Sequence, residues 1–301
     1  MRNLQLYRYV DAVARTGSIR QAAERLSITP SALNRRILAL EEELGVPVFE
    51  RLGHGVRLSA AGELLIRMIR GQLAEVEQFK SRVADLTGLR RGHVSIACSQ
   101  ALLPYFMPSQ IASYQAAFPK VTFRVQVMDG EAAETALRDF DADLALVFEP
   151  PRRAESLTLL SVPQPIHVLL AADHPLAGAE RLSFLDCLAY PLALPTHAYS
   201  MRHILDRYAE RLSVRLSPSV EADSYVLLRN FVSQTHAIAF ELRIGVPPEL
   251  MSAGIASIPL VTPRLPEGSL HVAQLKGRTL SVAAARFGQQ LAEALINQRQ
   301  S

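Results

Sequence analysis

The chain has 301 residues, of which 49% are hydrophobic, 20% are charged and 6% are aromatic, and its formal net charge is +3. This length and apolar content suffice for two or three domains with buried cores, which excludes a disordered tail protein. Apolar runs such as residues 167–172 are much shorter than the roughly 20 residues of a membrane helix, which excludes an integral membrane protein. The N-terminal residues lack the apolar core and cleavage site of a signal peptide, so we expect a cytoplasmic protein.

The excess positive charge lies at the beginning of the chain. Residues 1–59 contain nine Arg and six Asp or Glu, a net charge of +3, whereas the remaining 23 basic and 23 acidic residues cancel. This asymmetry is typical of a basic segment that binds a polyanion. Cys98 and Cys187 have neither CxxC spacing nor neighbouring histidines, which argues against a zinc site, a redox pair or a disulfide. We therefore expect two buried packing cysteines and no metal or cofactor.

Three helices are predicted in the first 45 residues, because apolar residues recur there at helical spacing between typical start and stop residues. Ser18 followed by Gln21 forms a capping box for the second helix. Thr29 before Pro30 places an N-cap and a proline at the first helical position of the third helix. The first and third helices end at Gly17 and Gly45.

The second and third helices are joined by a three-residue turn and form a predicted helix-turn-helix. Residues 46–49 and 56–58 flank a glycine-rich turn and predict a small hairpin, or wing. Polar and basic side chains near the start of the third helix suit base edges and phosphates. The expected DNA contacts are Ser18, Arg20, Thr29, Pro30, Ser31, Asn34, Arg35, Arg36, Arg51, His54 and Arg57. The alternative, a helical subdomain with solvated arginines, is disfavoured by the wing, the charge asymmetry and the cap spacing.

Residues 6–65 resemble the winged helix-turn-helix of the LysR-type transcriptional regulators nearly position by position. The shared marks are Gly17-Ser18, Ala22-Ala23, Leu26, Leu40-Glu41, Leu44-Gly45, Phe49, Arg51, Ser59 and Gly62. The third helix opens with Thr29-Pro30-Ser31, where the family often has Ser-Gln-Pro, and Asn34 stands where the family often has serine. The usual glutamine that reads bases in this family is therefore absent.

A long amphipathic helix is predicted after the wing, with Ser59 as its cap and Gly88 as its stop. About thirty residues at 1.5 Å each span about 45 Å, and the apolar positions follow a heptad. The predicted dimerisation residues are Leu65, Ile69, Val76, Phe79, Val83 and Leu86. The alternative is that the helix packs against the C-terminal body of its own chain. The family resemblance instead implies antiparallel pairing of two subunits, whose two heads require a roughly palindromic operator in double-stranded DNA.

Short β-rich runs alternate with helical stretches from His93 onward, a rhythm typical of β-α-β units around a parallel sheet. Pro163 with Pro165 marks one crossing of the chain, and the proline-rich stretch 259–266 marks a second, which predicts two lobes. The resemblance to LysR-type regulators extends here through looser motifs such as His174-Pro175-Leu176-Ala177 and Lys276-Gly277-Arg278. It implies a bilobed effector domain built like a periplasmic binding protein.

The expected fold class is α/β, with an N-terminal winged helix-turn-helix, a long linker helix and a bilobed effector domain. The expected domains are the winged helix-turn-helix over 1–59, the linker helix over 60–89 and the effector domain over 90–301. Within the effector domain, we expect 90–162 and 267–301 in lobe 1 and 163–266 in lobe 2.

Ligands of open parallel sheets bind beyond the carboxyl ends of the strands, where helix N-termini favour negative charge. We therefore expect a small organic anion as the effector, bound between the lobes. The expected contacts are Ser99, Gln100, Gly130, Phe148, Thr196, His197 and Ser224.

The sequence contains no GxSxG, P-loop, HExxH or strand-linked GxGxxG motif, and its eight histidines are scattered, so no enzyme is expected. A solute-binding receptor is the alternative, because two such lobes alone would suit one; the basic head and the missing export signal oppose it. We expect a regulator whose binding or bending of promoter DNA is modulated by the effector. Its further expected partners are RNA polymerase and copies of itself, as a homodimer that assembles into a homotetramer.

Overall fold

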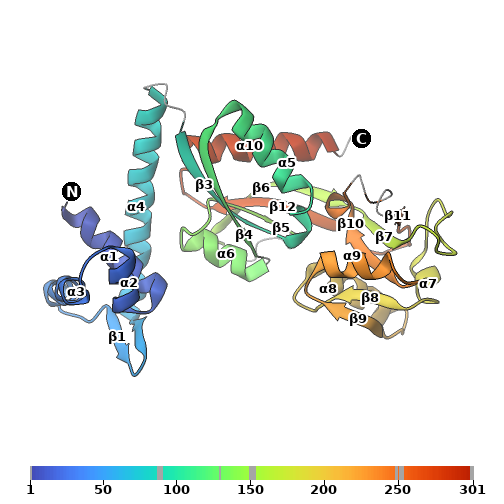
Figure 1. Cartoon of the computed structure of the whole chain (residues 1–301), viewed down its shortest axis with the longest axis horizontal. Helices are drawn as coiled ribbons and strands as arrows, with labels where there is room; N and C mark the ends of the chain where they lie inside the picture. The colour runs from blue at the N-terminus through green and yellow to red at the C-terminus, as the bar shows by residue number, and fades with distance from the viewer. Residues whose placement is uncertain are drawn as a thin grey trace. The chain divides into compact units, whose positions relative to one another are not determined.

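The computed structural model describes residues 2–86, 91–128, 130–148, 154–247, 250 and 254–298 (Figure 1). The chain divides into two compact units, one built mainly from Met1–Leu89 and the other mainly from Arg90–Leu137, Ala142–Arg278 and Ala283–Ser301. Within the described part, no helix is long and apolar enough to cross a membrane.

The N-terminal unit is built from helices, with a small hairpin at one end (Figure 1). Its elements are α1 (Arg2–Thr16), α2 (Ile19–Arg25), α3 (Pro30–Leu44), β1 (Phe49–Leu52), β2 (Gly55–Leu58) and α4 (Ala60–Leu86). Ser18 Oγ accepts a hydrogen bond from Gln21 N, and Thr29 Oγ1 accepts one from Ala32 N, so both predicted N-caps are present. Gly45 ends α3 with a left-handed backbone, φ 71°, as the sequence predicts. The predicted stop at Gly88 lies outside the described residues.

The first strand of the wing differs from the prediction. It begins at Phe49, so the expected strand over 46–49 is wrong for its first three residues. The backbone N–H groups of Val48 and Phe49 both donate to Glu41 Oε1, at 2.7 and 2.9 Å. This segment is therefore anchored to α3 before it pairs with β2, where Phe49 faces Leu58 across the antiparallel ladder.

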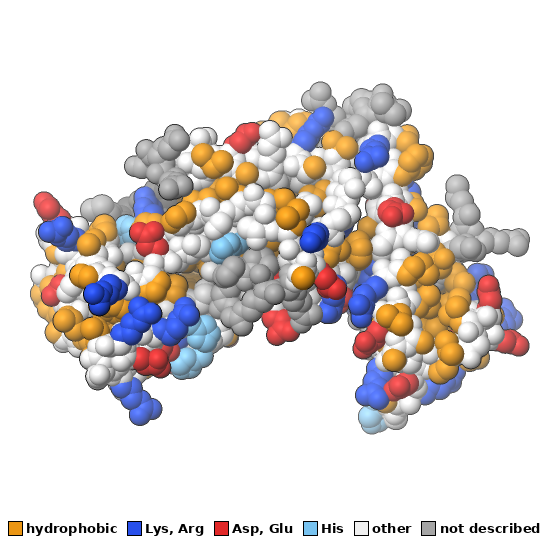
Figure 2. Space-filling model, turned by 180° about the vertical axis from the view of Figure 1, so that it is seen from behind, with side chains coloured by type: hydrophobic (Ala, Val, Ile, Leu, Met, Phe, Trp, Pro, Cys, Tyr) orange, Lys and Arg blue, Asp and Glu red, His pale blue; other side chains and the backbone are white. Residues whose placement is uncertain are grey.

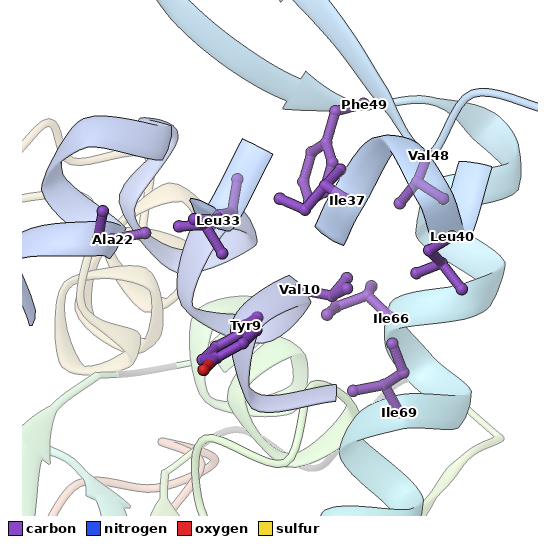
Figure 3. Close-up of a cluster of buried hydrophobic side chains, with 12 residues drawn as sticks. Tyr9, Val10, Ala22, Leu33, Ile37, Leu40, Val48, Phe49, Ile66 and Ile69 are labelled. Carbon is purple, nitrogen blue, oxygen red and sulfur yellow. The ribbon is translucent and has the colours of Figure 1, made fainter. Parts of the chain in front are cut away.

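One hydrophobic core holds the N-terminal unit together (Figure 3). Val10 of α1 and Leu33 of α3 are fully buried in it, and Ala22 of α2 is small enough for the helices to pack closely. Ile66 and Ile69 of α4 lie in the same core. Ile69 is thus fully buried inside its own chain, and the prediction that it faces a partner helix is wrong: here the helix packs against its own subunit.

The C-terminal unit contains two five-stranded sheets. The first, in the order β4-β3-β5-β12-β6, comprises β3 (Arg91–Cys98), β4 (Lys120–Val127), β5 (Leu144–Val147), β6 (Ser156–Gln164) and β12 (Gly268–Leu275). The second, in the order β11-β7-β10-β8-β9, comprises β7 (Ile166–Ala171), β8 (Leu192–Pro195), β9 (Pro218–Ala222), β10 (Ile238–Leu242) and β11 (Ile255–Pro259). The chain passes from the first sheet to the second at Pro165 and returns between β11 and β12. The expected bilobed α/β fold is confirmed.

Short helices connect the strands of each sheet. Lobe 1, around the first sheet, contains the 3-10 helix η1 (Gln100–Leu102) and the helices α5 (Phe106–Ala117), α6 (Gly130–Arg138) and α10 (Val282–Gln298). Lobe 2, around the second, contains α7 (Phe184–Cys187), α8 (Ser200–Arg211), α9 (Tyr225–Val232) and the 3-10 helix η2 (Arg243–Gly245). Cys98 and Cys187 are both buried, as expected. Burial raises the pKa of the Cys187 thiol to about 12, which makes it a packing residue.

The sheets are mixed rather than parallel, which corrects the expectation of a parallel sheet. β3 pairs in parallel with β4 and β5, but β12 pairs antiparallel with β5 and β6. In lobe 2, β10 is parallel to β8 and antiparallel to β7. Three strands were missed by the sequence analysis: β6, β8 and β11. Each contains a proline near its end, which weakens the strand signal, and β6 and β11 are edge strands, where proline is tolerated.

Candidate nucleic-acid interface and interlobe site

The start of α3 presents small hydroxyl side chains to solvent. Thr29 and Ser31 are exposed, and their hydroxyl oxygens lie 3.3 Å apart. Arg35 follows one turn later, is exposed and forms no ion pair with any described residue. Hydroxyls and free amides at a helix N-terminus, with a cation one turn further on, match the phosphate contacts of a recognition helix.

A hydrogen bond links the recognition helix to the wing. Arg51 Nη2 of β1 donates to Asn34 Oδ1 of α3 at 3.1 Å. The acceptor of the Asn34 side chain is therefore engaged, while its amide hydrogens stay available as donors. Both residues are predicted DNA contacts, but the sequence does not indicate the bond between them, because they lie 17 residues apart.

The other predicted arginines are exposed in the N-terminal unit, and three of them have protein partners. The Arg36 guanidinium lies 5.3 Å from the centre of the Tyr9 ring, a cation–π contact. Exposed ion pairs join Arg57 to Glu50 at 2.7 Å and Arg20 to Glu24 at 3.2 Å. Such surface pairs contribute little free energy, so phosphate groups can compete for these side chains. Figure 2 shows basic side chains and a histidine at the end of this unit that carries the hairpin.

The wing is held against the helices by close backbone contacts, and a side chain at Gly55 would not fit there. Val56 N donates to Gly17 O at 2.8 Å, and a Cβ added at Gly55, which has φ 100°, would lie 2.4 Å from that oxygen. Ser59 Oγ donates to Pro47 O at 2.6 Å and accepts from Gly62 N at 3.0 Å. These contacts fix the position of the predicted tip residue His54, which is exposed.

Beyond the core, α4 exposes apolar side chains. Phe79 is 67% exposed, Leu64 and Met68 are also exposed, and Val83 is 42% exposed. Leu65 and Val76 are half-buried, whereas the side chain of Leu86 lies outside the described residues. Figure 2 shows hydrophobic side chains along this helix. An exposed apolar stripe of this kind marks an interaction surface.

Gln100 is the predicted effector residue that the structure places at the junction of the lobes. Its Oε1 accepts from Tyr225 N at 2.7 Å, and its Nε2 donates to Asp223 O at 2.8 Å. Nε2 also donates to Tyr199 Oη at 3.1 Å. Ser224, another predicted contact, is next to these groups, but its Oγ accepts from Leu227 N and caps α9.

The remaining predicted effector residues have other environments. Ser99 and Phe148 are buried at the ends of β3 and β5, and Gly130 begins α6 with φ 50°. Thr196 N donates to Ala222 O in lobe 2. His197 Nδ1 lies 3.2 Å from Asp206 Oδ2 on α8, so the structure places His197 with α8 rather than with the Gln100 group.

A buried ion pair that the sequence analysis missed lies in lobe 2, between α9 and β10. Arg229 Nε is 3.3 Å from Glu241 Oε2, and the side chains are 8% and 1% exposed. Burial raises the pKa of Glu241 to about 8, although the Arg229 charge opposes this rise. Arg229 Nε and Nη2 and both Glu241 carboxyl oxygens have no hydrogen-bond partner among the described residues. No motif marks these two residues, and only the tertiary fold brings them together.

A winged helix-turn-helix with a basic tip, followed by a long helix and two α/β lobes, defines a DNA-binding transcriptional regulator with a ligand-binding portion. The family models bear this out: "Bacterial regulatory helix-turn-helix protein, lysR family" matches residues 4–63, and "LysR substrate binding domain" matches residues 87–296. The chain belongs to the LysR family of bacterial transcriptional regulators. It is thus a DNA-binding regulator with an effector-binding domain, and not an enzyme.

Relatives match along nearly the whole chain. The uncharacterized HTH-type transcriptional regulator YybE of Bacillus subtilis is 27% identical over 285 residues, covering 93% of this chain and 95% of its own. A full-length OxyR variant from Pseudomonas aeruginosa has a TM-score of 0.72 at 20% identity, covering 97% of this chain and 94% of that one. CbnR in complex with its target DNA has a TM-score of 0.63 at 18% identity, covering 97% and 99%. The two structural likenesses establish the fold.

Proposed function

We propose that the start of α3 and the wing form one DNA-reading surface, with α3 in the major groove and the hairpin beside it. The hydrogen bond between Arg51 and Asn34 carries this proposal, because it holds the base-reading helix and the wing in one geometry. Thr29, Ser31 and Arg35 contact phosphates, while the free amide hydrogens of Asn34 reach base acceptors. The full set is Ser18, Arg20, Thr29, Pro30, Ser31, Asn34, Arg35, Arg36, Arg51, His54 and Arg57.

The protein acts as a homodimer through α4. Val76, Phe79 and Val83 contact the partner helix, with Leu65 and Leu86 as further members of the stripe, whereas Ile69 stays in the core of its own subunit. Two symmetric heads read a roughly palindromic operator. Two dimers associate through their lobes to form a tetramer, which binds two DNA sites and bends the DNA between them. This bend changes the contact of the protein with RNA polymerase. The protein acts in the cytoplasm.

The domains divide this work. Residues 1–59 read DNA, 60–89 dimerise, and 90–301 bind the effector, with 90–162 and 267–301 in lobe 1 and 163–266 in lobe 2. A small organic anion binds between the lobes, because a helix N-terminus that faces a ligand favours negative charge. Ser99, Gln100, Gly130, Phe148, Thr196 and Ser224 line or support this site, with His197 at its margin. The two DNA-binding units of the dimer can adopt two relative angles. The effector shifts the equilibrium between these two arrangements only as far as its affinities for them differ.

Titration of DNA from the region upstream of the gene, at several salt concentrations, tests the DNA-reading surface. Removal of two phosphate-binding charges in Arg35→Ala/Arg36→Ala should weaken binding to every sequence and reduce the slope of log affinity against log salt by about 2. The matched control is Arg181→Ala/Arg211→Ala, which removes two exposed charges from lobe 2. An unchanged affinity and salt slope in the α3 variant would contradict the proposal.

A further inference from the structure

The carboxamide of Gln100 connects lobe 1 to lobe 2. Gln100 begins η1, directly after β3 and Ser99, and both hydrogens of its Nε2 donate to lobe 2, to Asp223 O and to Tyr199 Oη. Its Oε1 accepts from Tyr225 N. The neutral side chain of Gln100 in lobe 1 therefore binds two backbone groups of lobe 2, the acceptor Asp223 O and the donor Tyr225 N.

This arrangement selects a primary carboxamide over a carboxylate. The hydrogen of Tyr199 Oη is already used, because the hydroxyl donates to Asp223 O at 2.8 Å, so towards Gln100 it acts as an acceptor. A carboxylate would gain the Tyr225 N–H but would bring no hydrogen to the Asp223 carbonyl or to Tyr199. Oxygen lone pairs would then face the exposed Asp223 carbonyl and the half-buried Tyr199 hydroxyl without a hydrogen between them, which is unfavourable.

The polar groups behind η1 provide a second, independent observation. Arg229 lies one helical turn beyond Tyr225 on α9, and its Nε and Nη2 have no hydrogen-bond partner among the described residues, although Nε forms the ion pair with Glu241. A Cβ added at Gly245 would lie 2.5 Å from Glu241 Oε1 and 3.1 Å from Ala101 O, so the Glu241 carboxyl, whose oxygens also lack a hydrogen-bond partner among the described residues, lies close to η1. Buried polar atoms without hydrogen-bond partners are rare, and here the Arg229–Glu241 pair that contains them lies close to η1, the helix that begins with Gln100.

We propose that Gln100 is an internal substitute for the effector, and that the groups it binds form a subsite for a primary carboxamide on that effector. This inference rests on the proposed function, in which the effector binds between the lobes. The small organic anion of the proposed function carries this carboxamide, which binds the backbone N–H of Tyr225. Binding displaces Gln100 and removes its contact between the lobes, which couples occupancy to lobe arrangement. Because Gln100 competes for the subsite, it lowers the apparent affinity for the effector.

Chemical rescue tests the subsite directly. Gln100→Ala removes the atoms beyond Cβ, and acetamide replaces them. We expect acetamide to produce a saturable shift of the Tyr225 backbone amide resonance in the full-length variant. The apparent Kd of acetate for the same variant should be at least tenfold higher. The apparent Kd of acetamide for the wild type should also be at least tenfold higher. Gln100→Ser repeats the titration with a different truncation, in case the alanine variant folds poorly.

Equal responses to acetamide and acetate in both variants, or no saturable shift with either, would overturn the subsite. Retardation of upstream DNA by the wild type, measured on the same preparation, separates the two proposals. DNA binding without selectivity for acetamide would remove the subsite alone. Selective acetamide binding without DNA binding would support the subsite and contradict the proposed function.

Discussion

Asn34, the proposed base-reading residue, is hydrogen-bonded to Arg51 of the wing. The Arg51 guanidinium donates to Asn34 Oδ1, so under the proposed function the amide hydrogens of Asn34 are the groups that would meet a base acceptor. Asn34→Ala should reduce the preference of the protein for its operator over mismatched sites by about 1–3 kcal/mol, the range of one base contact. Competition binding with operators mutated one base pair at a time measures this change. A uniform loss for all sequences would assign Asn34 to the phosphates instead.

The buried Glu241 carboxyl predicts a pH dependence of stability. Its folded pKa of about 8 lies above its ordinary value of 4.5, so its stabilising contribution is complete below pH 4.5 and is lost as the pH rises through 8. Arg229 faces this carboxyl, and His167 pairs with Glu241 across the sheet. Burial, with the nearby Arg243 charge, lowers the pKa of His167 to about 4, so His167 is neutral throughout the range above pH 6.5.

Denaturant unfolding at pH 6.5 and 8.5 tests whether the unfolding free energy falls as the pH rises. The wild type should lose about 2 kcal/mol of unfolding free energy between these two values. Glu241→Gln, which is neutral at both, should lose much less and should be the more stable protein at pH 8.5. Parallel curves for the two proteins would show that Glu241 ionises normally in the fold.

At the scale of elements, the wing depends on a close approach between α4 and the segment before β1. A Cβ added at Gly62 would lie 2.0 Å from Val48 O, a backbone atom that cannot move aside without breaking the bonds to Glu41. Gly62→Ala should therefore lower the unfolding free energy of the N-terminal unit by about 1–3 kcal/mol.

Gly53→Ala is the matched control, because a Cβ at Gly53 in the hairpin turn would meet nothing within 4 Å. Thermal unfolding followed by circular dichroism should separate the two variants. If they unfold at the same temperature, the approach of α4 to Val48 is not a constraint on this unit.

Elements defined by local chemistry could be predicted from the sequence, and those defined by distant partners could not. The N-caps Ser18 and Thr29 bond to amides three residues away, which the spacing already reveals. The start of β1 depends on Glu41 in another element, and β6 is an edge strand whose pairing with β12 joins segments more than 100 residues apart. For the same reason, residue types indicated Gln100 as a site residue, but not its bonds to Tyr225 and Asp223.

At the scale of the whole molecule, the apolar stripe on α4 predicts that the protein associates. Phe79 is 67% exposed and would be covered in a dimer. Phe79→Asp loses about 1.5–3 kcal/mol of apolar burial and adds a charge that must be desolvated, so the dimer Kd should rise at least tenfold. Analytical ultracentrifugation measures this, with Leu185→Asp as the control at a 60% exposed position in lobe 2. Equal dimerisation of both variants would place the subunit contact elsewhere.

The concentration of net positive charge in residues 1–59 and the fold of that segment both assign DNA reading to one end of the chain. Footprinting of the wild type on its own upstream region at low salt is the most direct test. We predict two protected half-sites, related by a twofold axis and lying on one face of the duplex, with protection lost in Arg35→Ala/Arg36→Ala. Absence of protection at every salt concentration, with the protein folded, would contradict the account.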